Sequence, residues 1–369
     1  MKEQNNNIIS QFFVAIRCMT FQHANYIKDT LDGFCRQKTL FPFVALVVDD
    51  ASTDGEQDVI NRYMDEHFDL AGLSILPDLY VSENRQTDYE AMGKRNMQLA
   101  LHAAPWRCDA EEGVYTFAQH KTNKNCYFLS LNLKKNLYGV KGSKVKLIAP
   151  WDNAKYIAMC EGDDYWTDPY KLQKQVDFLE GHEEYILCFH KCKNFIQRTG
   201  EFTQEFVKDM PGESTITDLA KENYIHTPSV VYRRDDRVVA DQKRLPHNLA
   251  VGDYVLWMLL AQYGKIMKLP DEMAVYRIGV GVWSPQPLSY TAPRWCRVLL
   301  ELVKYFDIAI PQVSEILEQQ MCDTIELSIK DLEYTCLRLK GVGNSHAYRL
   351  GKFILRPFSW VKRKIKGIK

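Results

Sequence analysis

The stretch CEGDDYWTDP at residues 160–169 places two adjacent carboxylates, Asp163 and Asp164, after a short apolar run at 156–159. An amphipathic pattern typical of a helix follows from Pro169 onward. In α/β sheets, ligands bind at the carboxyl ends of strands. Two like charges this close repel each other unless a cation or hydrogen-bond donors neutralise them. Because Mg²⁺ and Mn²⁺ prefer oxygen ligands, the pattern predicts a divalent metal that carries a diphosphate.

A simpler interpretation of the same stretch is a solvated turn at the start of a helix. Asp168 would be the N-cap and Pro169 the first helical residue, which is a common arrangement. This interpretation explains those two residues but not the preceding pair, Asp163 and Asp164. The carboxylate pair therefore favours a binding site.

A second acidic stretch, DDASTDG at residues 49–55, follows the apolar, partly β-branched run at 43–48. Such a run is typical of a buried parallel strand. An earlier strand is expected at 12–16, and a helix after residues 20–27. The order of strand, helix, strand and acidic loop predicts a βαβ nucleotide-binding half. Neither strand is followed by a Gly-rich phosphate loop, so carboxylates and a metal would hold the nucleotide.

Three motifs in this order carry a family resemblance: VVDDASTDG at 47–55, CEGDDYWTDPYKLQKQ at 160–175 and GDYVLWM at 252–258. With them the chain resembles an inverting glycosyltransferase of family 2, of the type that acts in bacterial polysaccharide and glycan biosynthesis. The resemblance covers roughly residues 9–284. It implies an α/β GT-A fold, a Rossmann-like mixed sheet flanked by helices.

The resemblance also implies an activity. A sugar would pass from a nucleotide sugar, expected to be a UDP-sugar, to a hydroxyl of a glycan or lipid-linked acceptor. The reaction would be a single displacement with inversion, and it would depend on Mg²⁺ or Mn²⁺.

On the donor side, the resemblance assigns roles to residues from three parts of the chain. Asp50 would read the nucleoside base, and Thr20 and Phe21 would flank that base. The basic residues Lys94 and Arg95 fall where relatives often contact the nucleotide.

At the reacting centre, Asp163 would lie near the ribose and Asp164 would bind the metal. Asp253 would be the catalytic base. From the residues alone, Asp253 is more simply the N-cap of the helix that begins beside it.

One position departs from the family pattern. Many relatives read Tyr-Arg-x-His near the end of the catalytic core, whereas here Gly279 takes the place of the His. Arg277 or His226 would then neutralise the phosphate, and Trp166 is a further candidate on the acceptor side. The departure leaves a non-catalytic, nucleotide-sugar-binding homologue as an alternative.

Two other enzyme classes are less favoured. A sugar nucleotidyltransferase would carry a Gly-rich, Arg-containing loop after the first strand, and residues 18–23 contain no glycine. Paired carboxylates alone would also permit a glycosidase.

The composition of the 369-residue chain limits the classes of partner and the cellular compartment that are expected for it. Lys and Arg together number 47, and so do Asp and Glu. The chain therefore has no net positive charge that would favour binding to nucleic acid. No signal-peptide core or run of about 20 apolar residues is present. Ten cysteines in so long a chain predict free thiols in a reducing cytoplasm rather than a disulfide scaffold. Zinc at Cys188, His190 and Cys192 would lack a fourth ligand, so a core strand is favoured there.

The chain divides into three predicted parts: a catalytic domain at 1–285, a helical appendage at 286–344 and a basic tail at 345–369. An insertion at about 102–151 interrupts the first part and contains a hairpin, expected from strands at 115–117 and 126–131.

In the appendage, helices are expected at 295–306 and 313–339, packed on the catalytic domain. The tail mixes basic residues with Trp and Phe and has no acidic residue. This composition predicts peripheral binding to an anionic membrane, at the inner face of the cytoplasmic membrane.

Overall fold

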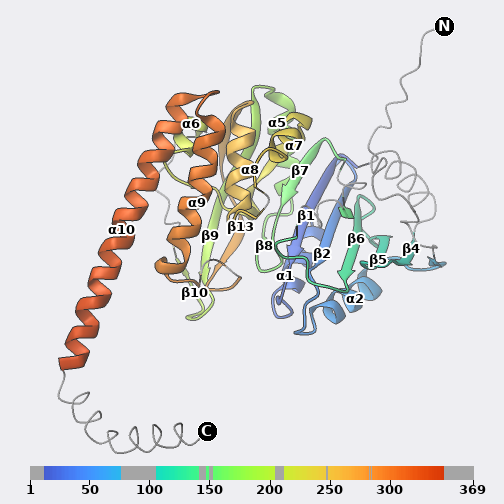
Figure 1. Cartoon of the computed structure of the whole chain (residues 1–369). Coiled ribbons are helices and arrows are strands. Elements are labelled where there is room, and N and C mark those ends of the chain that lie inside the picture. Colours follow the sequence, from blue (N-terminus) through green and yellow to red (C-terminus); the bar gives the residue numbers. More distant parts are fainter. Residues whose placement is uncertain are drawn as a thin grey trace, which may run out of the picture.

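The computed structural model describes residues 12–75, 105–140, 147–148, 153–203, 212–246, 248–281, 283 and 285–344. Within them the strands form one mixed sheet with the order β11-β13-β9-β12-β7-β1-β2-β6-β5-β4-β3. Helices flank this sheet, and the last helix extends away from the body of the molecule (Figure 1).

The centre of the sheet consists of four parallel strands: β7 (Tyr156–Met159), β1 (Val14–Thr20), β2 (Phe43–Asp49) and β6 (Cys126–Leu133). Side chains of β2 alternate between two hydrophobic clusters, one on each face of the sheet. Burial on both faces explains why this strand is apolar throughout. The predicted strands at 43–48 and 156–159 are confirmed. The first strand begins two residues later than predicted and continues to Thr20, because its pairing with β2 extends to Asp49.

Two helices follow the first two strands. Helix α1 (Ile27–Cys35) connects β1 to β2, and helix α2 (Glu56–His67) follows β2. Both contribute to the same cluster, through Leu31 and Phe34 of α1 and Ile60 and Met64 of α2. The predicted βαβ order is therefore confirmed.

The region predicted as an insertion contributes strands to the same sheet. Strands β4 (Trp106–Asp109) and β5 (Gly113–Gln119) join β6 as an antiparallel meander, which includes the predicted hairpin. The short strand β3 (Ser74–Ile75) pairs with β4. Because β6 runs beside β2, the chain that leaves β6 lies next to the acidic loop after β2.

The other half of the sheet carries the second and third motifs. Its strands are β8 (Tyr165–Trp166), β9 (Tyr185–Ile196), β10 (Glu201–Thr203), β11 (Glu213–Ser214), β12 (Val231–Arg233) and β13 (Lys265–Ile278). Its helices are α5 (Lys171–Gly181), α6 (Ile216–Leu219), η1 (Thr227–Ser229), α7 (Asp236–Gln242) and α8 (Gly252–Ala261). The predicted core strand at 185–190 is confirmed, and His190, Cys188 and Cys192 are buried in it.

The predicted start of α5 is wrong by two residues. The N-cap is Tyr170, so Asp168 and Pro169 lie outside the helix. The Asp168 carboxylate still serves the helix start, because its Oδ1 accepts a hydrogen bond from the Tyr170 N–H at 2.7 Å.

Two helices follow the sheet, as expected: α9 (Leu288–Phe306) and α10 (Pro311–Asn344). Packing of α10 on the body is confirmed for its first turns only, where Val313 and Leu317 are buried. From Ile325 to Leu339 the apolar side chains of α10 are exposed. In the part of the chain that the structure describes, no helix combines the length and apolar character needed to cross a bilayer.

Candidate functional site

The acidic motifs meet where the central strands end. The Gly162 N–H donates to the Met19 carbonyl at 3.2 Å, and the Asp50 N–H donates to the Thr20 carbonyl at 3.0 Å. A Cβ at Gly162 would lie 1.9 Å from Thr20 Oγ1. Only glycine therefore allows the second acidic motif to cross the end of β1 this closely, and the crossing brings Thr20, Asp50 and Asp163 to one edge of the sheet.

Glu56, which the sequence interpretation missed, fastens the loop after β1 to the loop after β2. It is buried and accepts hydrogen bonds from the Thr20 hydroxyl, from the His23 N–H at 2.9 Å and from the Ser52 hydroxyl at 2.9 Å. Burial raises the pKa of Glu56 to about 7, although these three donors oppose the shift. In the sequence, Glu56 is marked only by its place directly after DDASTDG. An acidic residue there is equally typical of a solvated helix start.

Asp50 is buried and already held by the chain that leaves β6. Its Oδ1 accepts from the Leu137 N–H at 2.7 Å, and its carbonyl accepts from the Asn136 side chain at 2.9 Å. The next residue, Ala51, has a φ of 59°, which is uncommon for a residue with a side chain. Backbone held in this region is often associated with ligand sites. Residues after β6 thus contribute directly to the predicted base-binding position.

Asp163 is approached by two residues that the sequence interpretation did not single out. His23 Nε2 lies 3.7 Å from Asp163 Oδ2, and burial lowers the pKa of His23. A Cβ at Gly281 would lie 2.8 Å from the same oxygen, and Gly281 has a φ of +69°. The loop after β13 can therefore close on Asp163 because its residue there is glycine.

Asp164 is buried, and its two carboxylate oxygens differ. Oδ1 accepts from the Arg277 N–H at 2.8 Å, whereas Oδ2 has no hydrogen-bond partner among the described residues. Burial, followed by repulsion from Asp163, raises the pKa of Asp164 well above its usual range. A buried carboxylate with one unsatisfied oxygen beside a second carboxylate fits a cation site. No group of three or more His, Cys, Asp or Glu side chains is assembled for a metal among the described residues.

Arg277 links the acidic motif to α1. Its guanidinium donates to the Asp163 carbonyl at 2.5 Å and to Asp29 Oδ2 at 2.5 Å, and it lies over the Tyr165 ring at 4.6 Å. The Arg277 guanidinium is thus engaged in contacts with other groups of the protein. Two residues later, Gly279 has a φ of +86°, a region that favours glycine over histidine. This backbone conformation is a local reason for the departure from the Tyr-Arg-x-His pattern.

A cavity of about 400 Å³ lies between the acidic motif, the loop after β13 and the start of α8. Glu161, Asp163, His226 and Asp253 are among the residues that line it. The structure therefore brings together predicted residues that are up to 90 positions apart in the chain.

Asp253 is half-buried in this cavity wall and held at both oxygens. Oδ1 accepts from the Tyr254 N–H at 2.8 Å, and Oδ2 accepts from the Thr227 hydroxyl at 3.2 Å. Burial raises the pKa of Asp253. The N-cap of α8 is Val251, so the interpretation of Asp253 as the N-cap is wrong.

Other predicted residues lie elsewhere. Trp166 does not line the cavity: it is buried, and its indole N–H donates to the Pro228 carbonyl at 2.8 Å. Phe21 is half-buried directly after β1. Lys94 and Arg95 lie outside the described residues.

No known protein-family model matches the sequence. Among curated proteins, the chain is 30% identical over 272 residues to the uncharacterized protein Rv1520 of Mycobacterium tuberculosis and, equally, to Mb1547 of Mycobacterium bovis. Each alignment covers 73% of this chain and 60% of the relative. The chain thus spans about 60% of the length of the curated relatives it matches.

A solved structure shares the fold. The structure of S. aureus TarS in complex with UDP-GlcNAc matches with a TM-score of 0.51 and 15% sequence identity. The match covers 85% of this chain and 71% of that chain. The predicted α/β architecture of the GT-A kind, a mixed sheet flanked by helices, is confirmed.

Proposed function

We propose that this protein is a glycosyltransferase that moves a sugar from a nucleotide sugar to a hydroxyl of a glycan or lipid-linked acceptor. The observation that carries the proposal is the shared cavity of Asp163 and Asp253, beside the unsatisfied oxygen of Asp164. The fold shared with TarS, whose structure contains UDP-GlcNAc, supports a UDP-sugar as the donor.

The donor half of the site would bind the nucleotide through residues at the ends of β1 and β2. Asp50 would accept from the base, since a carboxylate can accept further hydrogen bonds beyond the one from Leu137. Thr20 and Phe21 would flank the base, and Asp163 would lie near the ribose. Lys94 and Arg95 would be basic residues near the phosphates of the nucleotide.

A divalent cation, Mg²⁺ or Mn²⁺, would be held by Asp164, with Asp163 and Glu161 close by. When bound, it would offset the negative charge of the departing diphosphate. The chain itself holds Asp164 Oδ1 in place through the Arg277 N–H, which leaves Oδ2 for the cation. His226, which also lines the cavity, would assist on the phosphate side.

Asp253 would take the proton of the acceptor hydroxyl. Thr227 and the Tyr254 N–H fix the orientation of its carboxylate, and each oxygen retains a further lone pair for the acceptor. A base in this position needs to lie within hydrogen-bond reach of the hydroxyl. Displacement by that oxygen in a single step inverts the configuration at the sugar carbon.

The alternative function is nucleotide-sugar binding without transfer. One observation favours it: the Arg277 guanidinium is engaged by Asp163 and Asp29, and Gly279 offers no side chain to the diphosphate. Incubation with several nucleotide sugars and Mn²⁺ separates the two functions. Slow hydrolysis of one donor supports a transferase, whereas binding without turnover supports the alternative.

We expect UDP to bind in a metal-dependent way. Titration calorimetry with Mn²⁺ should show binding that weakens after chelation, because Asp164 Oδ2 has no other described partner. In Asp164→Ala the affinity with Mn²⁺ should fall to the value measured after chelation. Asp177→Ala, which removes an exposed carboxylate from α5, is the matched control and should bind normally. Equal affinity with and without the metal would contradict the metal site.

The basic tail at 345–369 lies outside the described residues, and membrane binding remains a proposal for it. The full chain should sediment with vesicles that contain anionic lipid, and a chain ending at residue 344 should not. Eight Lys and Arg residues in the tail, at about 1 kcal/mol each near such a surface, make binding salt-sensitive. If the full chain ignores anionic vesicles at low salt, peripheral attachment at the inner face of the cytoplasmic membrane is wrong.

A further inference from the structure

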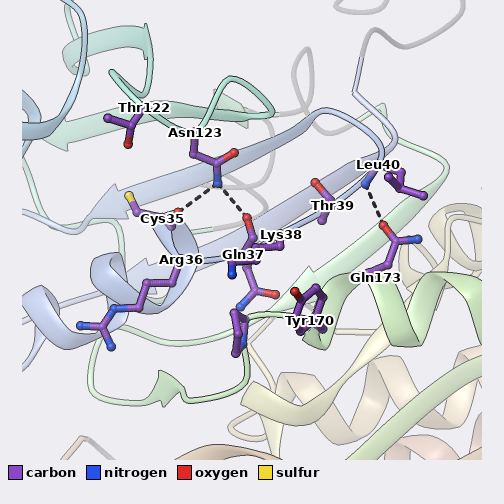
Figure 2. A pocket seen from close by; sticks show the side chains of 11 residues that line it. Cys35, Arg36, Gln37, Lys38, Thr39, Leu40, Thr122, Asn123, Tyr170 and Gln173 are labelled. Carbon is purple, nitrogen blue, oxygen red and sulfur yellow. Dashed lines mark hydrogen bonds between the residues drawn. The ribbon is translucent and has the colours of Figure 1, made fainter.

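Hydrogen bonds join neighbouring segments across the surface of the body. At a cavity of about 810 Å³ beside the end of α1, the Asn123 side chain donates to the Cys35 carbonyl at 3.0 Å and to the Gln37 carbonyl at 2.7 Å (Figure 2). At another wall of this cavity, the Leu40 N–H donates to Gln173 Oε1 of α5 at 2.8 Å (Figure 2). These segments are therefore held by partners within the chain. The second half of α10 differs in this respect.

Helix α10 leaves the core after Met321, and residues 322–340 form its free half (Figure 1). Each Ile, Leu and Tyr side chain in the free half is at least 45% exposed. The hydrogen bonds and ion pairs described for it stay within α10, as does the ion pair of Lys330 with Glu326 at 3.9 Å. Because a helix in a protein gains most of its stability from the packing of an apolar face, a partner for the free half is expected.

One apolar stripe of the free half has a regular repeat. Its spacings are three, four, three, four and three residues, and its members are Cys322, Ile325, Ile329, Leu332, Cys336 and Leu339. All six side chains are exposed. The spacing averages about 3.5 residues, which is the heptad repeat of a coiled coil. We call this stripe the seam.

The seam begins where α10 leaves the core. One heptad earlier, the same two positions are occupied by Glu315 and Glu318, and both are exposed. The seam therefore does not continue along the part of α10 that packs on the body. A partner helix could contact the free half without displacing Val313 or Leu317 from the core.

Charge and periodicity indicate a second helix, and not a lipid surface, as the partner. The free half carries four acidic and three basic residues: Asp323, Glu326, Asp331 and Glu333, and Lys330, Arg338 and Lys340. Helices that lie on anionic bilayers are instead rich in Lys and Arg. A repeat of about 3.5 residues keeps its apolar side chains facing a second helix that coils around the first.

We propose that two copies of this chain associate through the seam as a parallel, two-stranded coiled coil. Symmetric pairs of identical chains are the commonest soluble oligomers, and each copy supplies the same heptad surface. Ile329 takes an a position of the heptad, and Leu332 and Leu339 take d positions. Isoleucine at a with leucine at d favours two strands. The inference does not depend on the proposed glycosyltransferase activity.

The residues beside the seam favour the parallel orientation. Glu326 and Glu333 take e positions, and Met321 and Ser328 take g positions. In a parallel pair, e residues face g residues of the other copy, so each glutamate meets an uncharged side chain. In an antiparallel pair, e residues face e residues, and glutamates of the two copies would repel each other. Parallel copies would carry both sheets at one end of the coil, and the segments after residue 344 at the other.

The free half is short, so the dimer should dissociate on dilution. Residues 322–340 span about 28 Å, at about 1.5 Å per residue. A strip of this length and one helix wide is smaller than the ~800 Å² that a standard interface buries on each partner. Sedimentation velocity of the full chain over a wide dilution series should therefore show the mass fall from that of a dimer toward 42.9 kDa.

Two matched variants test whether the seam is the interface. Ile329→Lys with Leu332→Lys places charges in the seam, where both side chains are 51% exposed, and should weaken association by about a hundredfold or more. Leu327→Lys with Tyr334→Lys adds the same charges at f positions, which face away from the partner, and removes side chains that are 56% and 60% exposed. This control should dimerise like the original chain. Circular dichroism shows whether each variant keeps its helix content.

The two exposed cysteines of the seam test the orientation. Bismaleimidoethane, a short crosslinker of thiols, is applied to the full chain with Cys35→Ala and Cys296→Ala, because these are the other cysteines that are not buried. Cys322 and Cys336 take a positions, so in a parallel pair each lies next to its own counterpart. A chain that retains only Cys322 and a chain that retains only Cys336 should then both form covalent dimers. In an antiparallel pair Cys322 would lie near Cys336 of the other copy, and neither single-cysteine chain would crosslink.

Four outcomes would overturn the proposal. The full chain could remain a monomer throughout the dilution series, or the control with Leu327→Lys and Tyr334→Lys could lose the dimer as completely as the seam variant. Crosslinking only when both Cys322 and Cys336 are present would contradict the parallel arrangement. A monomer that sediments with anionic vesicles only while the seam is intact would identify the seam as a lipid-binding face instead.

Discussion

Asp253→Asn should reduce sugar transfer by about a hundred- to ten-thousand-fold, which is the usual contribution of a positioned general base. Asparagine has nearly the same shape, and its amide oxygen can still accept from the Tyr254 N–H, so the start of α8 should remain folded. Nucleotide affinity should hardly change, because Asp253 lies on α8 whereas the proposed donor residues follow β1, β2 and β7. Transfer rates with the identified donor, together with calorimetry of UDP binding, check both parts of the prediction.

Asp236→Asn is the matched control, since it removes an exposed carboxylate from the first turn of the neighbouring helix α7. It should transfer sugar normally. Normal turnover by Asp253→Asn would mean that Asp253 only orders the start of α8. The pH dependence gives a second check: because burial raises the pKa of Asp253, the acidic limb of the rate should lie above pH 3.8, the usual value for an Asp.

Lys171→Met should remove a large pH dependence of stability. Lys171 is fully buried, its ammonium donates to Gln175 at 2.7 Å, and it lies over the Trp166 ring at 4.1 Å. Burial lowers its pKa from 10.5 to about 7. Between these values the unfolded chain holds the proton and the folded chain does not, so the free energy of unfolding rises with pH.

The size of this effect follows from the same two values. Each pKa unit corresponds to about 1.4 kcal/mol, so the lysine should destabilise the fold at and below neutral pH by up to about 5 kcal/mol. Methionine has a similar length and no charge, but it leaves the Gln175 oxygen without this donor, which costs about 1–3 kcal/mol. The variant should therefore be the more stable protein near pH 6, and its advantage should shrink as the pH rises toward 9.

Urea denaturation at several pH values measures the difference between the variant and the original chain. Lys124→Met, at an exposed position in the turn before β6, is the control and should leave the pH profile unchanged. Parallel profiles for the original chain and Lys171→Met would show that the buried amine keeps its ordinary pKa.

Some of this architecture could be predicted because it depends on local patterns. The runs at 43–48 and 156–159 are short, apolar and followed by acidic residues, so both the strands and the position of the candidate site follow from them. The pairing of β6 with β2 could not be predicted, because the two strands are about 80 residues apart and no local pattern specifies a non-local partner. For this reason the region after residue 102 reads as an insertion, although its strands extend the sheet.

The least predictable residues are polar side chains that turn inward. Lys171 and Gln175 each precede an apolar residue of the predicted helix, and periodicity alone assigns them to its solvated face. Glu56 and His23 are likewise unremarkable in the sequence. Their burial depends on neighbours from other parts of the chain, which compensate for the loss of water with specific hydrogen bonds: Glu56 accepts from the His23 N–H, and Gln175 donates to the Cys188 carbonyl of β9.

The length of helix α10 limits which acceptors the protein could reach at a membrane. Its 34 residues span about 50 Å, and its last side chain that packs on the core, Met321, lies near the start, so the free part extends about 35 Å beyond the body. Figure 1 shows this helix starting beside α9 and then leaving the body of the molecule. If the tail beyond residue 344 rests on a bilayer, an upright helix would hold the reacting hydroxyl tens of ångströms above the lipid headgroups. An acceptor reached in that posture must be a chain of several sugars, whereas a short lipid-linked acceptor requires the helix to lie flat.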